Sequence, residues 1–398
     1  MKIAILGAGN AGCISALHFQ HFGRTHGLEI DIYHSPVEHP MEKVGQGTTL
    51  APLEYIESIL KTNWYDNNIG ATFKSGILYE NWGKKNDKIF HSFTKAGMSM
   101  HYVPSLLSKA VLESGVFNVT EKTINDPESE VDADWIIDCR GKDRKGEIEY
   151  LPLKNPLNSA LLYKKAGRDP DLHYTRTVAT PNGWTFVIPN QDSVSYGYLY
   201  NDTITSTQVA RADFLERFDL PETDGSSLKF DNYIAKDVCV GDRTILNGNR
   251  CAFLEPLEAT STAFYQKVCQ VAWDYINTLD NIDGGKNVYG HNHKPLLPTR
   301  ADKDYMNDHI HGAMQQIETF VLWHYQNGSK FDTPFWEYAK SIPFTTDRYF
   351  ENVYKAAKKY DWQDGCIITN SAAGDDAKYY FYSQWHLNSF KCWIDGVE

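Results

Sequence analysis

The first 34 residues constrain the fold of this chain more than any other segment. Residues 2–6 (KIAIL) form a short apolar run, which is typical of a buried parallel strand. A glycine-rich stretch at residues 7–12 (GAGNAG) follows, and helical periodicity then continues to Gly23. A second strand is expected at residues 28–33 (LEIDIY). Together they predict a βαβ unit of about 30 residues at the start of a Rossmann-type α/β fold.

The spacing of the glycines predicts a dinucleotide-binding turn. The first glycine permits a tight turn, the second lets a pyrophosphate approach the backbone, and the third allows the helix to pack closely on the strand. N–H groups at the start of the helix would then bind the phosphates. The motif does not distinguish FAD from NAD, and His34 or Ser35 stands where an acid for the ribose is expected. The expected cofactor-binding residues here are Gly7, Gly9, Asn10, Ala11 and Gly12.

Charge and cysteine usage exclude several classes of protein. The chain has 39 basic and 51 acidic residues, a net charge of −12, which disfavours binding to nucleic acids and anionic membranes. Its seven cysteines are scattered without a CxxC motif, as expected of reduced thiols in a cytoplasmic protein. The sequence offers no run of roughly 18 apolar residues for a membrane span. We expect a soluble cytoplasmic protein; a monomer and a homo-oligomer both stay open.

The rest of the chain predicts alternating strands and helices followed by a helical end. The body at 1–290 is expected to interleave several segments, and residues 291–398 to form a mainly helical cap on the substrate side. Strands are expected at 72–82, 135–139, 184–188 and 194–200, and helices at 103–114, 262–279 and 301–325. Aromatic residues near the end of the chain could line a pocket or pack the cap: Tyr379, Tyr380, Phe381, Tyr382 and Trp385.

A second motif leads into the helix expected at 262–279. Residues 247–261 (NGNRCAFLEPLEATS) combine small and polar side chains with a proline, and their backbone N–H groups suit an anion at the helix start. Taken alone, Glu255 and Glu258 would be surface carboxylates that favour the helix N-terminus.

This segment also carries a resemblance to a known family. Residues 253–261 (FLEPLEATS) resemble the F-x-E-P-L-E-S-T-G signature of flavin-dependent tryptophan halogenases. Three further segments match the family, in the order in which the family has them. These are 44–49 (VGQGTT) for its V-G-E-A-T segment, 72–74 (TFK) with Asn81-Trp82 for the segment with its essential lysine, and 183–189 (GWTFVIP) for W-x-W-x-I-P. Weaker matches at 137–141 and 332–336 extend the resemblance to about residue 340.

The chain departs from the family pattern at several positions. Phe186 replaces the second Trp of W-x-W, Gln46 replaces the acid of V-G-E, and residues 259–261 read Ala-Thr-Ser instead of Ser-Thr-Gly. The chain is also shorter than a typical member, mainly in its C-terminal part, and in this it resembles short, phage-encoded members of the family. These departures leave the chemistry in place and leave the substrate open.

The resemblance implies an FAD-binding, monooxygenase-like fold with an interleaved antiparallel sheet and a small C-terminal helical cap. It implies FADH2, O2 and a halide ion (chloride, bromide or iodide) as reactants, a separate flavin reductase and a small aromatic substrate. Reduced flavin and O2 form a hydroperoxide that halide attacks, which gives hypohalous acid. Further FAD-binding residues implied are Gly45, Gln46, Gly47, Thr48, Gly248, Asn249 and Leu257.

The resemblance also assigns roles near the reaction. Lys74 would direct hypohalous acid to the ring, and Glu258 would accept the ring proton. Taken alone, Lys74 could be an exposed strand lysine. Backbone N–H groups of Thr260 and Ser261 would hold the halide. An apolar wall between flavin and substrate, which could equally be core packing, would comprise Trp184, Phe186, Ile188 and Pro189.

Two other readings of the chain remain. An FAD-dependent aromatic monooxygenase shares the fold but transfers OH, and a haloperoxidase-like or redox-inactive flavin protein is the third alternative. The pairs His291/His293 and His309/His311 could suggest a metal. Residues 301–325 are expected to be helical, and on a helix residues two apart diverge, so His309 and His311 should point apart and no metal site is expected.

Overall fold

The computed structural model divides the chain into two compact units, and each unit is built from three segments. The first unit takes Met1–Ala71, Tyr102–Leu153 and Tyr233–Met314, and the second takes Thr72–His101, Lys154–Asn232 and Gln315–Glu398. The predicted boundary at residue 290 falls outside the described residues and stays a prediction. The structure describes residues 1–23, 26–36, 44–48, 50–63, 65–93, 99–221, 227–282, 300–359, 381–383 and 385–397.

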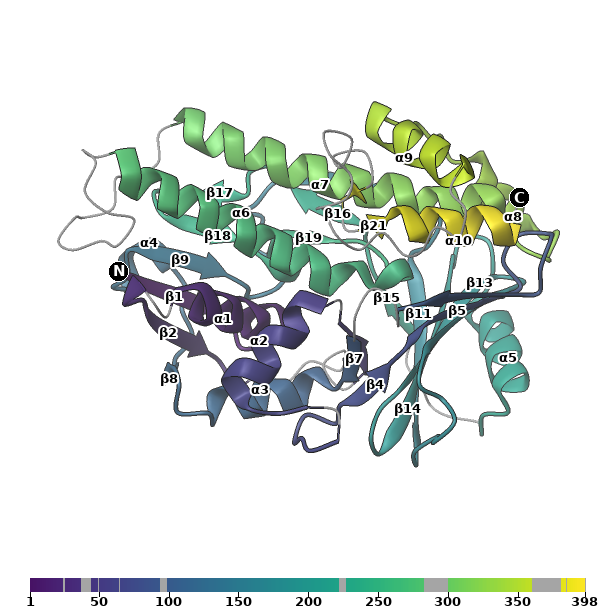
Figure 1. Cartoon of the computed structure of the whole chain (residues 1–398), viewed down its shortest axis with the longest axis horizontal. Helices are drawn as coiled ribbons and strands as arrows, with labels where there is room; N and C mark the ends of the chain where they lie inside the picture. The colour runs from purple at the N-terminus through teal and green to yellow at the C-terminus, as the bar shows by residue number, and fades with distance from the viewer. Residues whose placement is uncertain are drawn as a thin grey trace. The chain divides into compact units, whose positions relative to one another are not determined.

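The first unit contains a six-stranded sheet that starts from the N-terminal strand (Figure 1). All neighbouring strands are parallel except the edge pair β17–β18. Four of the five residues of β1 are buried, which agrees with its apolar sequence. In sheet order the strands are β17 (Cys239–Val240), β18 (Thr244–Leu246), β9 (Trp135–Asp138), β1 (Lys2–Leu6), β2 (Glu29–His34) and β8 (Asn118–Glu121).

The helices of the first unit include several that pack against α1, which follows β1 after the glycine-rich turn. Ile5 of β1 faces α1, because its side chain lies 3.6 Å from the position of a Cβ on Gly12. The predicted βαβ start is therefore confirmed. The helices are α1 (Asn10–Gly23), α2 (Leu50–Leu60), α3 (Pro104–Leu112), α4 (Pro127–Glu130), α6 (Thr260–Ile282) and the first half of α7 (Arg300–Asn327).

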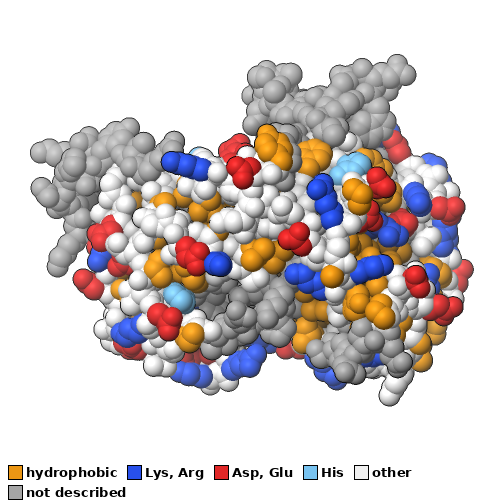
Figure 2. Space-filling view, turned by 90° about the horizontal axis from the view of Figure 1, so that it is seen from below, with side chains coloured by type: hydrophobic (Ala, Val, Ile, Leu, Met, Phe, Trp, Pro, Cys, Tyr) orange, Lys and Arg blue, Asp and Glu red, His pale blue; other side chains and the backbone are white. Residues whose placement is uncertain are grey.

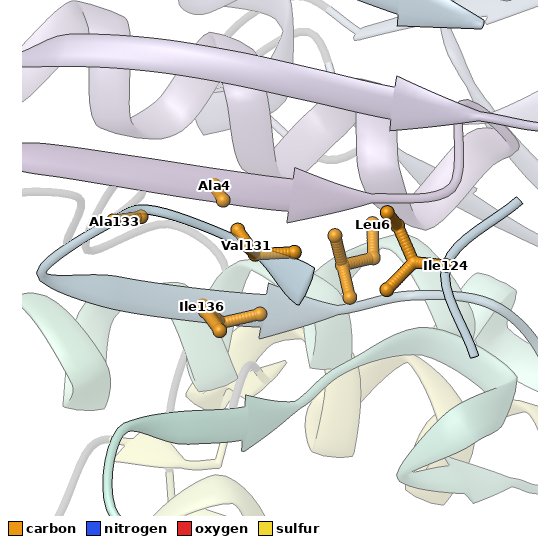
Figure 3. Packing of buried hydrophobic residues seen from close by; sticks show 6 residues of the cluster. All are labelled: Ala4, Leu6, Ile124, Val131, Ala133 and Ile136. Atoms are coloured by element: carbon orange, nitrogen blue, oxygen red, sulfur yellow. The ribbon is translucent and has the colours of Figure 1, made fainter. Parts of the chain in front are cut away.

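The opposite face of the same sheet buries a separate apolar cluster (Figure 3). Ala4 and Leu6 alternate with Ile5 along β1 and so point away from α1. They pack with Ile136 of β9 and with side chains that precede it: Ile124, Val131 and Ala133. Burial on both faces removes apolar area from water at roughly 25 cal/mol per Å² and holds β1 in the sheet.

Short elements complete the first unit. A three-stranded antiparallel sheet has the order β10 (Tyr150–Pro152), β16 (Tyr233–Ala235) and β19 (Ala252–Phe253). Two 3-10 turns, η3 (Gly248–Arg250) and η4 (Leu257–Ala259), flank β19, and β3 (Gln46–Gly47) precedes α2.

The second unit is organised around a seven-stranded sheet, antiparallel except for the pair β12–β5. One face packs on α5 (Thr207–Phe218), where Tyr198 and Tyr200 contact Phe214 and its neighbours. In sheet order the strands are β15 (Ser227–Lys229), β11 (Ser159–Ala166), β14 (Ser193–Tyr200), β13 (Gly183–Pro189), β12 (Thr175–Thr180), β5 (Gly76–Glu80) and β6 (Lys88–Ser92).

The single strand expected at 72–82 is two strands. β4 (Thr72–Lys74) pairs with β7 (Ser99–Tyr102), whereas β5 joins the seven-stranded sheet. The break falls at Ser75, whose N–H donates to the His173 carbonyl and whose carbonyl accepts the Phe93 N–H. These bonds divert the chain from one sheet to the next, which alternation of side chains alone could not indicate.

Helices at the C-terminal end of the second unit enclose an aromatic core. Trp385 stacks on Phe320 with ring centroids 4.0 Å apart, and Tyr382 meets Phe350 at 5.4 Å. Both side chains are buried, so these two aromatic residues pack the helical part instead of lining an open surface. The remaining elements are α8 (Pro334–Ser341), α9 (Arg348–Lys359), α10 (Leu387–Val397), β20 (Phe381–Tyr382) and β21 (Trp385–His386).

Candidate active site

The glycine-rich turn after β1 has the geometry of a phosphate cradle. Gly7 has φ = +98°, which favours glycine, and a Cβ there would lie 3.0 Å from the Cys139 carbonyl oxygen. On Gly12 a Cβ would lie 1.8 Å from the Gly7 carbonyl oxygen, so only glycine fits. Asn10 begins α1, and the Tyr102 hydroxyl donates to its Oδ1 at 2.6 Å. The bare backbone at a helix N-terminus fits the pyrophosphate of a dinucleotide such as FAD.

A second turn of the same unit lies directly against this cradle. Gly248 has φ = +62°, and a Cβ on it would be 2.4 Å from the Ala11 Cβ. The Tyr233 hydroxyl donates to the carbonyl of Asn249 at 2.7 Å and fixes the next residue of the turn. Two segments more than 200 residues apart in sequence therefore meet, and both contain residues expected to bind the cofactor.

A buried charge network holds this second turn. Arg250 donates from Nε to Asp138 Oδ2 at 3.1 Å and lies 3.4 Å from Asp143. Arg140 donates to both carboxylate oxygens of Asp138 at 2.9 and 2.7 Å. Removal of one partner would leave a buried charge without compensation, which typically costs about 3–5 kcal/mol. The pair Arg250–Asp138 joins residues 112 apart in the sequence and was not predicted.

The segment expected to contact the flavin, residues 45–48, includes the short strand β3. Gly45, Gly47 and Thr48 are buried, and Gln46 is half-buried. All four belong to the first unit, together with the glycine-rich turn.

Both carboxylates of the EPLE segment are buried. Glu255 is 0% exposed, and its Oε2 accepts the Leu257 N–H at 2.8 Å. Glu258 is 9% exposed, so the alternative of surface carboxylates is wrong. Glu258 and Ala259 have φ values of 69° and 53°, a left-handed conformation that costs of order 1–3 kcal/mol for such residues. Strain of this kind is typical of functional sites.

The strained residues lead directly into α6, which begins at Thr260. Thr260 is buried, Ser261 is half-buried, and Leu257 on the preceding turn is fully buried. The first N–H groups of a helix have no partner within it, and the helix dipole adds partial positive charge. The start of α6 therefore suits a small anion.

Lys74 is a buried cation in the second unit. Its side chain is 1% exposed, so the alternative of an exposed strand lysine is wrong. The Nζ atom lies 5.1 Å from the centroid of the Phe93 ring, a cation–π distance. His91 meets Phe93 edge-on at 5.3 Å. The ammonium is thus bordered by aromatic surface.

A hydrogen-bond network runs beside the strand that carries Lys74. His101 lies opposite Thr72 on β7, and its Nε2 is 2.8 Å from the Thr175 hydroxyl. The Thr72 hydroxyl lies 3.4 Å from His101 Nδ1 and donates to the Pro189 carbonyl at 2.9 Å. Burial holds the pKa of His101 well below its usual value, and the charge of Lys74 lowers it further. His101 is therefore neutral.

The expected apolar wall lies on β13. Trp184, Phe186 and Ile188 are 1%, 7% and 9% exposed and alternate onto one face of the strand. Phe186 lies over Gly197, where a Cβ would be 2.1 Å from its ring. Pro189 ends the strand, and its carbonyl accepts the Thr72 hydroxyl. This wall and Lys74 belong to the second unit, whereas Glu258 belongs to the first.

The second histidine pair shows no shared ligand geometry. His309 Nδ1 lies 2.9 Å from the Tyr305 carbonyl, and His311 Nε2 lies 3.0 Å from the Ala235 carbonyl. Within the described part of the chain, no group of three or more His, Cys, Asp or Glu residues could hold a metal ion. His291 and His293 lie outside the described residues.

The described part of the chain has two further features, which concern the hydropathy of its helices and the distribution of charge on its surface. Among the described helices, none is long and apolar enough to cross a membrane. On the face seen in Figure 2, acidic and basic side chains are interspersed with apolar ones.

Comparison with known proteins decides the family. A family model described as tryptophan halogenase matches residues 2–111 and 108–364. This chain belongs to the tryptophan halogenase family. The resemblance seen in the motifs is thereby confirmed.

Individual relatives of this family member are distant. Tryptophan 7-halogenase RebH of Lentzea aerocolonigenes is 24% identical over 286 residues, which cover 67% of this chain and 49% of that protein. Tryptophan 7-halogenase KtzQ of Kutzneria sp. (strain 744) is 24% identical over 289 residues, covering 67% of this chain and 48% of that protein. The chain thus spans about half the length of these curated relatives.

Solved structures support the fold. Tar14, a tryptophan C-6 flavin-dependent halogenase from taromycin biosynthesis, aligns with a TM-score of 0.75 at 16% identity, covering 100% of this chain and 90% of that one. At this identity the likeness shows the fold alone. It confirms the predicted α/β class with an FAD-binding, Rossmann-type architecture.

Proposed function

We propose that this chain halogenates an electron-rich aromatic substrate with FADH2, O2 and a halide ion. The observation that carries the proposal is the buried ammonium of Lys74 beside the Phe93 ring, in a member of the tryptophan halogenase family. Burial of a charge is costly, so a lysine that is only 1% exposed is an unusual feature of a strand.

In this proposal the first unit holds the cofactor. The bare cradle at Gly7 and Gly12 fits a pyrophosphate, and the Gly248 turn against Ala11 would bring further backbone toward it. Reduced FAD, once bound, supplies with O2 the two-electron oxidation of halide to hypohalous acid. The remaining residues proposed to hold FAD are Gly9, Asn10, Gly45, Gln46, Gly47, Thr48, Asn249 and Leu257.

The halide would bind at the start of α6. Thr260 and Ser261 offer backbone N–H groups at a helix N-terminus, where the dipole favours an anion. The left-handed backbone at Glu258 and Ala259 turns the chain into this helix and would aim those groups.

Lys74 would then direct the oxidant. Its ammonium can hydrogen-bond hypohalous acid, or its amine can carry the halogen as a haloamine. In the first route the ring carbon bonds to the halogen while the O–X bond breaks, and Lys74 donates the proton with which the oxygen leaves as water. In the second route water leaves when the N–X bond forms, and the N–X bond then breaks as the ring carbon takes the halogen. Glu258 would accept the ring proton, and the wall of Trp184, Phe186 and Ile188 would keep bulk water from the oxidant.

One assay tests the proposal against its runner-up, the FAD-dependent hydroxylase. The purified chain would be supplied with chemically reduced FAD, O2 and bromide, and with a panel of indoles and phenols. We expect products with bromine in place of a ring hydrogen by mass spectrometry. Products that gain one oxygen instead would establish the hydroxylase, and an unchanged panel would reject both enzymes.

The same preparation tests the need for a partner. Only one glycine-rich dinucleotide motif is present in the sequence, and FAD would occupy it. We therefore propose that a separate flavin reductase supplies FADH2. Steady oxidation of NADH or NADPH by the purified chain alone would contradict this.

A further inference from the structure

The side chain of the polar residue that directly follows β13 makes no hydrogen bond with the described part of the chain. Asn190 is 1% exposed, and neither its Oδ1 nor its Nδ2 bonds any of the described residues. Only its backbone is engaged, since its N–H donates to the Ser193 carbonyl at 2.7 Å. A buried amide without partners costs about 1–3 kcal/mol, so native proteins rarely keep one without a function.

Strand geometry places this amide beside the network around Lys74. Side chains two apart on a strand share a face, so Asn190 continues the face of Ile188. β12 and β13 are antiparallel, and Arg176 pairs with Val187. One residue further along this register, Ile188 lies opposite Thr175. The Thr175 hydroxyl bonds His101 on the same side.

The backbone next to Asn190 makes a direct link to the lysine strand. The carbonyl of Pro189 accepts the hydroxyl of Thr72 at 2.9 Å. Thr72 and Lys74 are two apart on β4 and share a face. Asn190 and Lys74 therefore border the same network.

The described polar side chains of the network around Lys74 already have contacts of their own. Thr72 donates to Pro189, His101 contacts Thr72 and Thr175, and Lys74 lies over Phe93. On this face of β13 the Trp184 Nε1 also lacks a partner among the described residues, but it can only donate. A ring N–H that enters here would therefore find its acceptor in the carboxamide oxygen of Asn190. An amide oxygen accepts the N–H of an indole ring, whereas a thiophene or a 1-methylindole offers it no donor.

We propose that Asn190 is a specificity-determining residue that accepts the ring N–H of a nitrogen heteroaromatic substrate at the lysine site. The inference rests on the proposed halogenase function, but its test reads binding as well as turnover. The expected substrate class is an aromatic with a ring N–H, such as an indole, a pyrrole or an azole.

A ligand pair that differs in one hydrogen tests the inference. Indole and 1-methylindole share the ring, but only indole donates from nitrogen. Dissociation constants of both would be measured calorimetrically on the FAD-loaded protein. We expect the unmodified chain to prefer indole by about tenfold, which corresponds to the loss of one buried hydrogen bond.

Two matched variants then assign the preference. Asn190→Leu keeps the approximate shape and removes both polar groups, so the preference should vanish while the unfolding free energy stays level or rises. Thr185→Val is the control, because Thr185 is likewise buried, at 0% exposed, and its hydroxyl also lacks a partner among the described residues. Thr185 pairs with Tyr198 on the face that packs on α5, so Thr185→Val should keep the preference.

The outcomes separate the two ideas. An indole preference that persists in Asn190→Leu, or is missing from the unmodified chain, overturns the role of Asn190. A preference that Asn190→Leu abolishes supports the role even if no variant halogenates indole, in which case the proposed function fails and the binding site stands.

Discussion

Gly248 lies directly against Ala11, so closely that a Cβ on Gly248 would be 2.4 Å from the Ala11 Cβ. Gly248 belongs to the turn η3, which precedes β19, and Ala11 belongs to the first turn of α1. The contact brings two distant segments to one side of the sheet, where both would reach a bound dinucleotide. Removal of this close approach should therefore weaken cofactor binding.

Gly248→Ala is expected to raise the dissociation constant of FAD by tenfold or more, because the added methyl group pushes the turn away from α1. Quenching of flavin fluorescence measures the effect without turnover. Gly115→Ala is the matched control: Gly115 has φ = +69°, close to the +62° of Gly248, but a Cβ there meets nothing within 4 Å. If both variants bind FAD equally well, the contact with Ala11 has no part in the cofactor site.

Lys74→Met is expected to abolish halogenation of the aromatic substrate while FAD binding is unchanged. The methionine keeps an unbranched side chain in the buried site but loses the ammonium beside Phe93. Product formation by mass spectrometry and FAD affinity by fluorescence would be measured together. Retention of a tenth of the activity, a barrier change of only about 1.4 kcal/mol, would remove Lys74 from the mechanism.

Glu258→Gln is expected to lower turnover by about 10²-fold, since the amide keeps the shape and cannot accept the ring proton. Glu255→Gln is the matched control in the same segment. The Glu255 carboxylate accepts the Leu257 N–H, and a glutamine oxygen can accept the same bond, so turnover should change little. Equal losses in both variants would show that Glu258 has a structural role like that of Glu255.

Local patterns predicted the fold well because they depend on neighbours in sequence. The helix expected at 262–279 is α6 (Thr260–Ile282), and the helix expected at 301–325 is α7 (Arg300–Asn327). Apolar periodicity determines which face of a helix is buried, and this periodicity can be recognised from the local sequence alone. The βαβ start was predictable for the same reason.

Features that depend on distant partners were not predictable. The ion pair of Arg250 with Asp138 joins residues 112 apart, and the local sequence around either residue does not indicate its partner. The break at Ser75 likewise depends on the His173 carbonyl, 98 residues away. The burial of Glu255 depends on the packing of distant segments, which a single sequence does not reveal. The same holds for the amide of Asn190, which has no partner among the described residues.

The helix α1 carries a buried histidine, His18. His18 is 2% exposed, and neither ring nitrogen has a hydrogen-bond partner among the described residues. Its ring packs against Phe19, Phe22 and Tyr55 at centroid distances of 5.5, 4.7 and 5.3 Å. Burial, with a smaller effect from His21, lowers the pKa of His18 to about 3. The folded chain therefore holds a neutral imidazole between pH 6.5 and about pH 3, a range in which the imidazole of the unfolded chain is protonated.

The sign of the pH dependence follows from that difference. The unfolded chain binds this proton near pH 6.5, and the folded chain binds it only near pH 3, so stability is lost as the pH falls through this window. From pH 7 to pH 5 the loss due to His18 should be about 2 kcal/mol. His18→Leu should lose that much less over the same interval, measured as the free energy of unfolding in urea. His309→Gln, at an exposed position, is the control and should behave like the unmodified chain. An unchanged pH dependence in His18→Leu would mean that the imidazole is not held neutral in the folded chain.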